Sequence, residues 1–342
     1  MTTTQEEVVR GITTNPGIVV MLGASDRGKT TWCLELANAL VKEGNKVGVV
    51  DGDIGQSDLG PPTTVSLGCL ESPVQGWDEM TPQASFFVGT TSPIGHEGWC
   101  VAAVTRMVQA AWGRQCDVVL VDTTGLVQGR YGRQLKGAKL AALLPNHIVA
   151  VQKDDELVPL LAGWPFKKTQ VWHLTPPEGI KKRDTTERQR LRQAAYCRYW
   201  RHGKTRRLSL DNLSCWRTRY RSARPLAPEE LARCREDLGQ ELVYAETSDQ
   251  GLWVVRSRSG HRPPRRTGVR WTDEKCFANL LVGLVGEDPD QVTVGIVEKV
   301  LWEEAKVQIF SPPVEEISGI IFGLMRVDRS GMELERLGLD DV

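Results

Sequence analysis

The sequence lacks several features that would place it in a special class of protein. No run approaches the ~18 consecutive apolar residues that a membrane-spanning helix needs. The first residues carry neither the basic start nor the apolar stretch of a secretory signal peptide. We therefore expect a cytoplasmic protein that does not associate with a membrane.

Cysteine and histidine are present, but not in the patterns of disulfide or metal sites. The eight cysteines are scattered without a C-x-x-C pair, and the five histidines show no metal-ligand spacing. In a chain of 342 residues this distribution predicts reduced thiols and disfavours a structural zinc site.

The chain has no excess of charge of either sign, with 43 basic and 43 acidic side chains. This balance disfavours a protein coated in positive charge for nucleic acid, but a sum hides how charge is distributed. Residues 181–224 contain fifteen Lys or Arg and three acids, a net charge of +12, so the remaining residues carry −12. A local site for a polyanion is therefore compatible with the neutral total.

Hydrophobic periodicity predicts an α/β fold. Strands are predicted at 17–22, 47–50, 86–88, 118–122, 148–151 and 169–174, with helical patterns over 34–41, 100–112 and 134–144. This alternation favours a parallel sheet with helices on both faces. After Pro225, a helix over 227–238 and β-like runs at 252–256, 292–300, 306–310 and 319–327 predict a small β-rich C-terminal domain. The stretch 261–266 is predicted to be a loop.

A phosphate-binding loop follows the first predicted strand. Gly23, Gly28, Lys29 and Thr30 match the Walker A pattern, and the match lies between a predicted strand and a predicted helix. Its glycines let backbone N–H groups surround phosphate oxygens at a helix N-terminus. Lys29 is expected to bridge the β- and γ-phosphates, and the Thr30 hydroxyl to ligate Mg²⁺. The expected nucleotide-binding residues are Gly23, Ala24, Ser25, Asp26, Arg27, Gly28, Lys29, Thr30 and Thr31.

Two carboxylates follow the second predicted strand, at the sheet edge where α/β proteins bind ligands. Asp51 and Asp53 lie two residues apart. A carboxylate there can hold Mg²⁺ through water or accept a proton from an attacking hydroxyl. Either residue can also be a turn-forming Asp.

These segments and the spacing between them resemble the P-loop polynucleotide 5′-hydroxyl kinases. That family includes the RNA kinases of mRNA 3′-end cleavage and polyadenylation and of pre-ribosomal RNA processing. The stretch from Val50 to Leu67 resembles the family's D-x-D-x-G-Q-S…P-P-G-x-V-S-L motif. Further likeness lies in 121–125, 135–139, 148–152, the basic segment, 281–284 and 294–298, so the resemblance spans most of 15–327. Only about sixteen residues precede the first predicted strand, so we expect a prokaryotic-type member without the eukaryotic N-terminal domain.

The resemblance implies roles for individual residues. Asp53 matches the family's general base, and Gln56 is expected near the acceptor. Asp51 is then a metal-site or structural acid. Thr123 and Gly125 match the family's T-x-G element and are expected to shape the acceptor site.

A basic lid is predicted beside this site. Asp184 and Glu187 have capping-box spacing, which starts a helix over about 185–200. Arg188 and Arg192 then share one helix face, with Arg183 just before the cap. Arginines at this spacing match the family's mobile lid, which neutralises charge in the transition state. The alternative is a solvated basic helix face.

The sequence departs from the family at two positions. The family's T-P-x-x-N loop is replaced by residues 91–96, and His96 stands near the place of the Asn. His96 is expected either to bind phosphate or polynucleotide or to be an exposed loop residue. Leu126 replaces the tryptophan that stacks on a base in eukaryotic members, which leaves nucleobase preference open.

The resemblance implies a kinase that transfers the γ-phosphate of ATP or GTP to the 5′-hydroxyl of RNA or DNA, with Mg²⁺ as cofactor, in RNA processing or nucleic acid repair. A nucleotide-binding scaffold and an ATPase or GTPase switch are the alternatives. The expected domains are an N-terminal extension (1–16), the kinase domain (17–205, with the lid at 181–200) and the β-rich domain (206–342).

Overall fold

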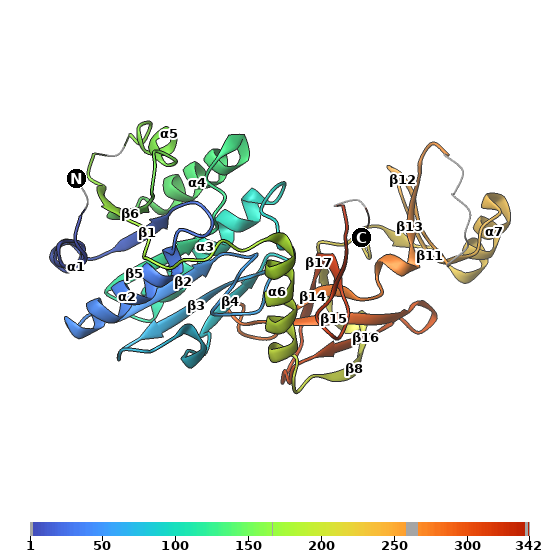
Figure 1. The fold of residues 1–342 in the computed structure, drawn as a ribbon. Coiled ribbons are helices and arrows are strands. Elements are labelled where there is room, and N and C mark those ends of the chain that lie inside the picture. The colour runs from blue at the N-terminus through green and yellow to red at the C-terminus, as the bar shows by residue number, and fades with distance from the viewer. Residues whose placement is uncertain (1–2, 166, 258–265, 339–340, 342) are drawn as a thin grey trace. The chain divides into compact units, whose positions relative to one another are not determined.

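The computed structural model describes residues 3–165, 167–257, 266–338 and 341. The chain divides into two compact units, Met1–Arg192 and Gln193–Val342, and the division falls inside helix α6 (Thr185–Tyr199) (Figure 1). The sequence placed this division at 205/206. The difference arises because strand β8 (Lys204–Ser209) pairs with strand β16 (Lys306–Ser311), which draws the chain before 206 into the second unit. The predicted loop at 261–266 lies almost wholly outside the described residues.

The described part of the first unit is built around one seven-stranded sheet, of order β4-β3-β2-β5-β1-β6-β7. Its strands are β1 (Ile18–Leu22), β2 (Val47–Gly52), β3 (Thr64–Leu70), β4 (Ala84–Phe87), β5 (Val118–Thr123), β6 (His147–Val151) and β7 (Gln170–Leu174). Its helices are α1 (Gln5–Thr14), α2 (Lys29–Lys42), α3 (Glu97–Gly113), α4 (Gly129–Leu143), α5 (Val158–Leu161) and the start of α6.

Helices cover both faces of this sheet, as predicted. Val20 and Leu22 of β1 pack with α3 and α4, whereas Val19 and Met21 pack with α1 and α2. Strand side chains alternate between faces, so a strand buried on both sides reads as a continuous apolar run. This is why the runs in the first half of the sequence identify sheet strands.

One edge of the sheet differs from the prediction. Strands β2, β5, β1, β6 and β7 run parallel, but β3 is antiparallel to β2 and β4 is antiparallel to β3. The sequence analysis did not identify β3. No helix separates β2 from β3, and without a crossover the chain can only turn back against the preceding strand.

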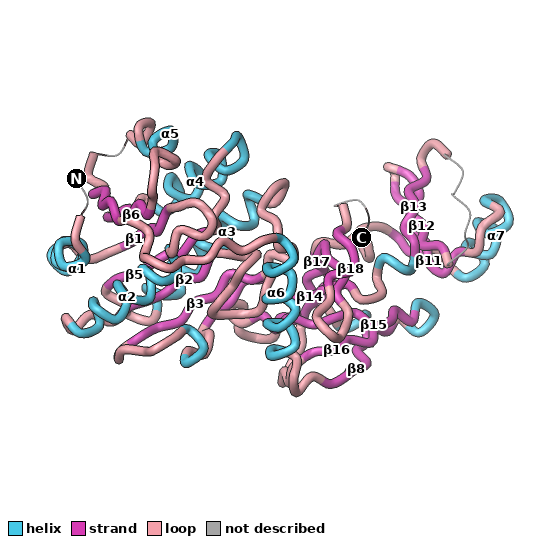
Figure 2. Tube along the Cα trace, viewed as in Figure 1, coloured by secondary structure: helices cyan, strands magenta, loops and turns pink. Residues whose placement is uncertain are grey.

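The second unit is β-rich, as predicted (Figure 2). One sheet has the order β10-β11-β12-β13, and another has the order β18-β17-β14-β15-β16-β8, with β9 paired to β17. The strands not yet given are β9 (Ser214–Trp216), β10 (Arg224–Pro225), β11 (Leu242–Ser248), β12 (Gly251–Arg256), β13 (Val269–Asp273), β14 (Leu280–Val285), β15 (Val292–Leu301), β17 (Gly319–Val327) and β18 (Glu333–Arg336). Helix α7 (Pro228–Leu238) precedes β11. Among the described residues, no helix is long and apolar enough to span a bilayer.

Candidate active site

The phosphate-binding loop connects the end of β1 to the start of α2. Gly28 is the N-cap of α2 and has φ +76°, and Asp26 also has a positive φ of +56°. A Cβ on Gly23 would lie 2.5 Å from the Val151 carbonyl oxygen. The glycines are therefore required by backbone conformation at one end of the loop and by close packing at the other. The result is a curled backbone at a helix N-terminus, which suits an anion.

The two Walker side chains after Gly28 are held at the C-terminal edge of the sheet. Lys29 is 7 % exposed, and its Nζ donates a 3.0 Å hydrogen bond to the Ala24 carbonyl oxygen inside the loop. The Thr30 hydroxyl donates a 2.6 Å hydrogen bond to Asp122 Oδ2. Asp122 lies near the end of β5, the neighbour of β1. Burial raises the pKa of Asp122, and nearby Lys29 counteracts this rise.

Asp51 organises the segment that follows β2. Its carboxylate accepts hydrogen bonds from the Asp53 N–H (3.1 Å), the Ser57 hydroxyl (2.8 Å), the Asp58 N–H (2.8 Å) and the Leu59 N–H (3.0 Å). Burial raises its pKa to about 7. Of the two roles open to Asp51 in the sequence, metal-site acid or structural acid, these bonds favour the structural one.

Asp53 has one oxygen engaged in its own turn. Its Oδ1 accepts hydrogen bonds from the N–H groups of Gly55 (3.0 Å) and Gln56 (3.1 Å). Its Oδ2 receives no hydrogen bond from a described residue. The Gln56 amide donates to the carbonyl oxygens of Gly55 (2.6 Å) and Arg188 (3.3 Å), which links this turn to the predicted lid. One Asp53 oxygen thus fixes the side chain and the other remains available to a ligand.

The predicted lid begins with a capped helix. Asp184 Oδ1 accepts the Glu187 N–H at 2.7 Å, as the capping-box spacing predicted. Arg188 reaches the phosphate-binding loop, where one of its terminal nitrogens (Nη2) lies 2.7 Å from Asp26 Oδ2. Asp26 Oδ2 also accepts the Arg183 N–H at 3.3 Å. The carboxylate of Asp26 therefore fastens the lid to the loop.

One cavity of about 590 Å³ brings these elements together. Its lining includes most of the phosphate-binding loop, the acceptor-side residues and the start of the lid. The predicted site residues that line it are Ser25, Asp26, Gly28, Lys29, Thr30, Thr31, Asp53, Gln56, Gly125, Arg183 and Arg188. The chemistry expected at three separate segments of the sequence thus converges on a single space.

The remaining predicted site residues are not part of the cavity lining that the structure describes. Thr123 is 1 % exposed, and its hydroxyl donates to the Met21 carbonyl oxygen, which ties β5 to β1. His96 is the N-cap residue of α3. Arg192 is 9 % exposed on α6. The others are Gly23, Ala24, Arg27 and Asp51; Arg27 forms a 2.7 Å ion pair with Glu156, and Asp51 holds its loop.

Gly125 lies directly against the phosphate-binding loop. A Cβ at this position would lie 2.1 Å from Ser25 Oγ and 2.5 Å from the Ser25 backbone nitrogen. Only glycine therefore allows the segment after β5 to approach the loop this closely.

Sequence reasoning assigned no role to three charged residues beside the site. Asp122 was visible as an acid at the end of a predicted strand, but it was given no role. Lys136 and Lys139 of α4 are fully buried: Lys136 Nζ donates to the Thr124 carbonyl oxygen, and Lys139 Nζ donates to the Gly52 carbonyl oxygen at 3.5 Å. Burial lowers the pKa of both lysines, and the carboxylates of Asp53 and Asp122 counteract this effect. Their helical spacing of three residues was the available signal.

Comparison with known proteins agrees with this geometry. Residues 23–202 match the family model described as mRNA cleavage and polyadenylation factor CLP1 P-loop. A Methanocaldococcus jannaschii protein named polyribonucleotide 5′-hydroxyl-kinase is 31 % identical, over 95 % of this chain and 91 % of the relative. A Thermococcus kodakarensis protein of the same name is 33 % identical, over 96 % of this chain and 93 % of the relative.

A solved structure shares the fold at much lower identity. It is the wild-type complex of Clp1p with Pcf11p, and its matching chain has a TM-score of 0.59 and 12 % identity, over 93 % of this chain and 77 % of the other. The fold, the family model and the two archaeal relatives agree with one another. The chain belongs to the CLP1 P-loop family of polyribonucleotide 5′-hydroxyl kinases.

Proposed function

We propose that this protein transfers the γ-phosphate of ATP or GTP to the 5′-hydroxyl end of RNA or DNA. The observation that carries the proposal is the cavity in which the phosphate-binding loop, Asp53 and the lid arginines meet. A phosphoryl-transfer site needs a cradle for the donor, a base for the acceptor and positive charge for the transferred group. Each of these is supplied here by a different segment of the chain.

The donor side is the loop that ends at Thr30. Backbone N–H groups at the start of α2 face the phosphates, and Lys29 exchanges its bond to the Ala24 carbonyl oxygen for contacts with the β- and γ-phosphates. The local cost of this exchange is small because Lys29 is already buried beside the loop.

The acceptor side is Asp53. The 5′-hydroxyl oxygen forms the new bond to the γ-phosphorus, and Asp53 Oδ2 accepts the proton that this oxygen loses. The bond between the γ-phosphorus and the β–γ bridging oxygen breaks in the same step. The turn that occupies Oδ1 keeps the carboxylate oriented during this step. Gln56 connects the same turn to the lid, so acceptor binding and lid position are coupled.

The lid supplies the positive charge. Arg183 and Arg188 line the cavity, and Arg192 follows one helical turn after Arg188. Guanidinium groups directed at the equatorial oxygens stabilise the charge that spreads over them in the transition state. The bond between Arg188 and Asp26 holds one guanidinium group near these oxygens before reaction.

The residues around Thr30 fit a magnesium ion. The Thr30 hydroxyl and the Asp122 carboxylate lie together beside the loop, and Mg²⁺ commonly binds through one or two such groups plus waters and substrate phosphates. We assign Thr30 and Asp122 to this ion and leave Asp51 to its structural role. Held by these two residues, Mg²⁺ would neutralise part of the charge on the nucleotide's phosphate groups.

End-labelling of a 5′-hydroxyl oligoribonucleotide with γ-labelled ATP, then GTP, tests the proposal. The 5′-hydroxyl RNA is expected to become labelled. The same RNA carrying a 5′-phosphate is expected to incorporate less label. Nucleotide binding without labelling would favour a scaffold, and nucleotide hydrolysis unaffected by the oligonucleotide would favour an ATPase or GTPase switch. A parallel DNA acceptor of the same sequence determines the preference between the two polymers.

A further inference from the structure

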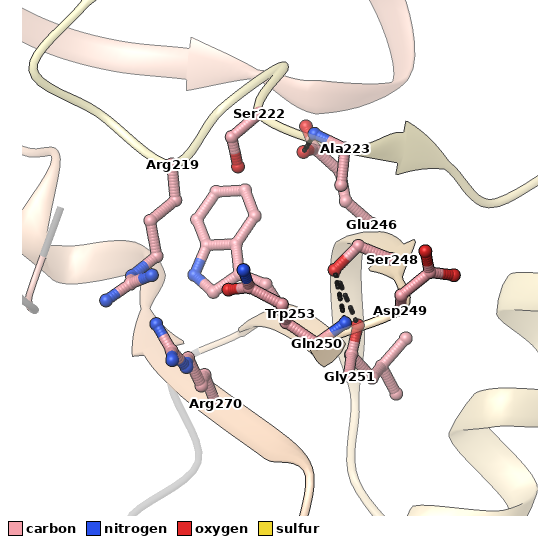
Figure 3. A pocket seen from close by; sticks show the side chains of 11 residues that line it. Arg219, Ser222, Ala223, Glu246, Ser248, Asp249, Gln250, Gly251, Trp253 and Arg270 are labelled. Carbon is pink, nitrogen blue, oxygen red and sulfur yellow. Dashed lines mark hydrogen bonds between the residues drawn. The ribbon is translucent and has the colours of Figure 1, made fainter.

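The proposed phosphoryl transfer leaves a cavity in the second unit and a pair of thiols in the first without a role. The cavity, of about 440 Å³, lies beside the turn between β11 and β12 (Figure 3). Its Trp253 is 6 % exposed and donates a 2.9 Å hydrogen bond to Thr272, so this wall belongs to the core of the unit. The thiols of Cys69 and Cys116, in contrast, are placed to react with each other.

Cys69 and Cys116 come together from segments that are far apart in the chain. Cys69 lies near the end of β3, and Cys116 lies between α3 and β5. Their sulfur atoms are 3.5 Å apart. A disulfide bond is about 2.05 Å long, so the two sulfurs need to approach each other by only about 1.5 Å to form one.

Gly48 of β2 makes room for this pair of sulfurs. It pairs in register with Cys69 across β2 and β3. A Cβ on Gly48 would lie 3.2 Å from the Cys116 sulfur and 3.0 Å from the Ala111 Cβ. Cys116 therefore occupies the space that a side chain at Gly48 would fill, next to the strand that carries Cys69.

Hydrogen bonds fix the backbone on both sides of the pair. The Cys116 N–H donates to the Ala111 carbonyl oxygen at 3.2 Å. The next residue, Asp117, donates its N–H to the Lys46 carbonyl oxygen and accepts the Lys46 N–H, each at 2.8 Å. Cys69 is held by the pairing of β3 with β2. Because neither backbone is free to move away, the two thiols stay close enough to react.

The two thiols differ in exposure and in charge. Cys69 is partly exposed, whereas Cys116 is 5 % exposed. The hydrogen bond from Cys116 lowers the pKa of Cys69 to about 7, and Arg114 and Lys46 act in the same direction. The same hydrogen bond, together with burial, raises the pKa of Cys116. Since the thiolate is the nucleophile, Cys69 is suited to attack an oxidant first, with Cys116 beside it to complete the bond.

We propose that Cys69 and Cys116 form an oxidation site for peroxides, which closes to an intramolecular disulfide and stabilises the first unit. The Cys69 sulfur attacks one oxygen of hydrogen peroxide, the O–O bond breaks, and a sulfenic acid and one water result. The Cys116 sulfur then attacks the Cys69 sulfur, the S–S bond forms, the S–O bond breaks, and a second water leaves. The two thiols together lose two electrons and two protons, and the peroxide that gains them becomes two waters.

The disulfide would form away from the nucleotide site. Leu70 of β3 pairs with Val47 at the start of β2, so the cysteines lie at the sheet edge opposite to the one where the phosphate-binding loop follows β1. The bond would link residues 47 positions apart, which restricts the unfolded chain and leaves the folded site unchanged. The proposal therefore does not depend on the proposed function.

The test exposes the full chain to hydrogen peroxide, blocks the remaining thiols and analyses tryptic peptides without reduction by mass spectrometry. We expect a peptide that links Cys69 to Cys116 to become the main form of both residues, and dithiothreitol to reverse it. Cys69→Ala and Cys116→Ala should each abolish the link. Cys100→Ala is the matched control, because Cys100 lies on the same tryptic peptide as Cys69, and it should leave the link intact.

Thermal unfolding measures the effect of the link on the fold. The melting temperature of the wild type should rise by roughly 5–10 °C after oxidation, and that of Cys116→Ala should not. Recovery of both cysteines unlinked after peroxide treatment would overturn the proposal, as would a link from Cys69 that persists in Cys116→Ala. An unchanged melting temperature in the linked protein would overturn the stabilising role.

Discussion

The Thr30 hydroxyl and the Asp122 carboxylate meet at 2.6 Å, although 92 positions separate them in the chain. Thr30 lies in the first turn of α2 and Asp122 near the end of β5, and the two elements are brought together because β5 pairs with β1 next to the phosphate-binding loop. The bond orients the hydroxyl that is expected to ligate Mg²⁺, and Asp122 would supply negative charge beside the ion.

Asp122→Asn is expected to reduce kcat about 100-fold or more while the fold persists, because the amide keeps the shape but not the charge that the metal site needs. Steady-state labelling across a range of Mg²⁺ concentrations measures the effect, and saturation should require more Mg²⁺. Asp117→Asn, just before the other end of β5, is the matched control and should remain within about twofold. Equal losses in the two variants would contradict the assignment.

Asp53→Asn is expected to abolish most transfer and retain nucleotide binding. The asparagine oxygen can still accept the N–H groups of Gly55 and Gln56, so the turn survives while the proton acceptor is lost. Equilibrium binding of ATP and single-turnover labelling of RNA separate these effects. Unchanged turnover would remove Asp53 from the role of base.

The sequence predicted the donor side of this site more completely than the rest because the phosphate-binding loop is a local motif. Lys29 and Thr30 are adjacent in the chain, so their proximity in the site follows directly from the sequence. The bond between Asp26 and Arg188 crosses 162 positions, and no periodicity encodes such a pairing. Asp122 is intermediate: its place at a strand end was visible, but its partner depends on the order of strands in the sheet.

The fold shows the same contrast between local patterns, which the sequence predicted, and long-range pairings, which it did not. Strands buried on both faces, such as β1 and β5, were evident as apolar runs. Strand β3 was missed because the prediction relied on helices alternating with strands, and β3 returns without a helix. The basic segment was evident as a run of charge, but Arg188 belongs to the first unit and Arg219 to the second, which charge alone did not indicate.

Arg188→Ala is expected to lower kcat by about 10³-fold and to weaken ATP binding only about threefold. The effect on kcat is larger because the Arg188 guanidinium group stabilises charge that develops during transfer. Arg190→Ala, two positions away on the exposed surface of α6, is the matched control and should have little effect. Arg192→Ala is expected to lower turnover more than ATP affinity in the same assay. A loss confined to ATP affinity in these lid variants would indicate a ground-state contact instead.

Cys69 is expected to react with iodoacetamide at lower pH than an ordinary thiol. The hydrogen bond from Cys116, 3.5 Å away, lowers the pKa of Cys69 to about 7, and Arg114 and Lys46 add to this effect. The sign follows from linkage: the thiolate stabilises the folded state above the unfolded pKa of about 8.5, and this stabilisation is lost as pH falls through 7.

Mass spectrometry of the alkylated peptides at several pH values checks this expectation, with the exposed Cys197 as the internal reference. Half-maximal alkylation of Cys69 should occur near pH 7 and move upward in Cys116→Ala. A midpoint that does not respond to the loss of the Cys116 thiol would contradict the pairing.

Gly125→Ala is expected to weaken ATP binding at least tenfold. Its methyl group would lie 2.1–2.5 Å from three atoms of Ser25, so the phosphate-binding loop or the segment after β5 must move, and the loop's N–H groups lose their alignment. Gly137→Ala is the control: apart from its own helical backbone and chain neighbours, no described atom lies within 4 Å of the added carbon. A helical alanine there should stabilise the fold by up to about 1 kcal/mol. Thermal unfolding and ATP titration of both variants distinguish a displaced loop from general destabilisation. If Gly125→Ala lowered the melting temperature but bound ATP normally, the close approach would be needed for folding and not for the nucleotide site.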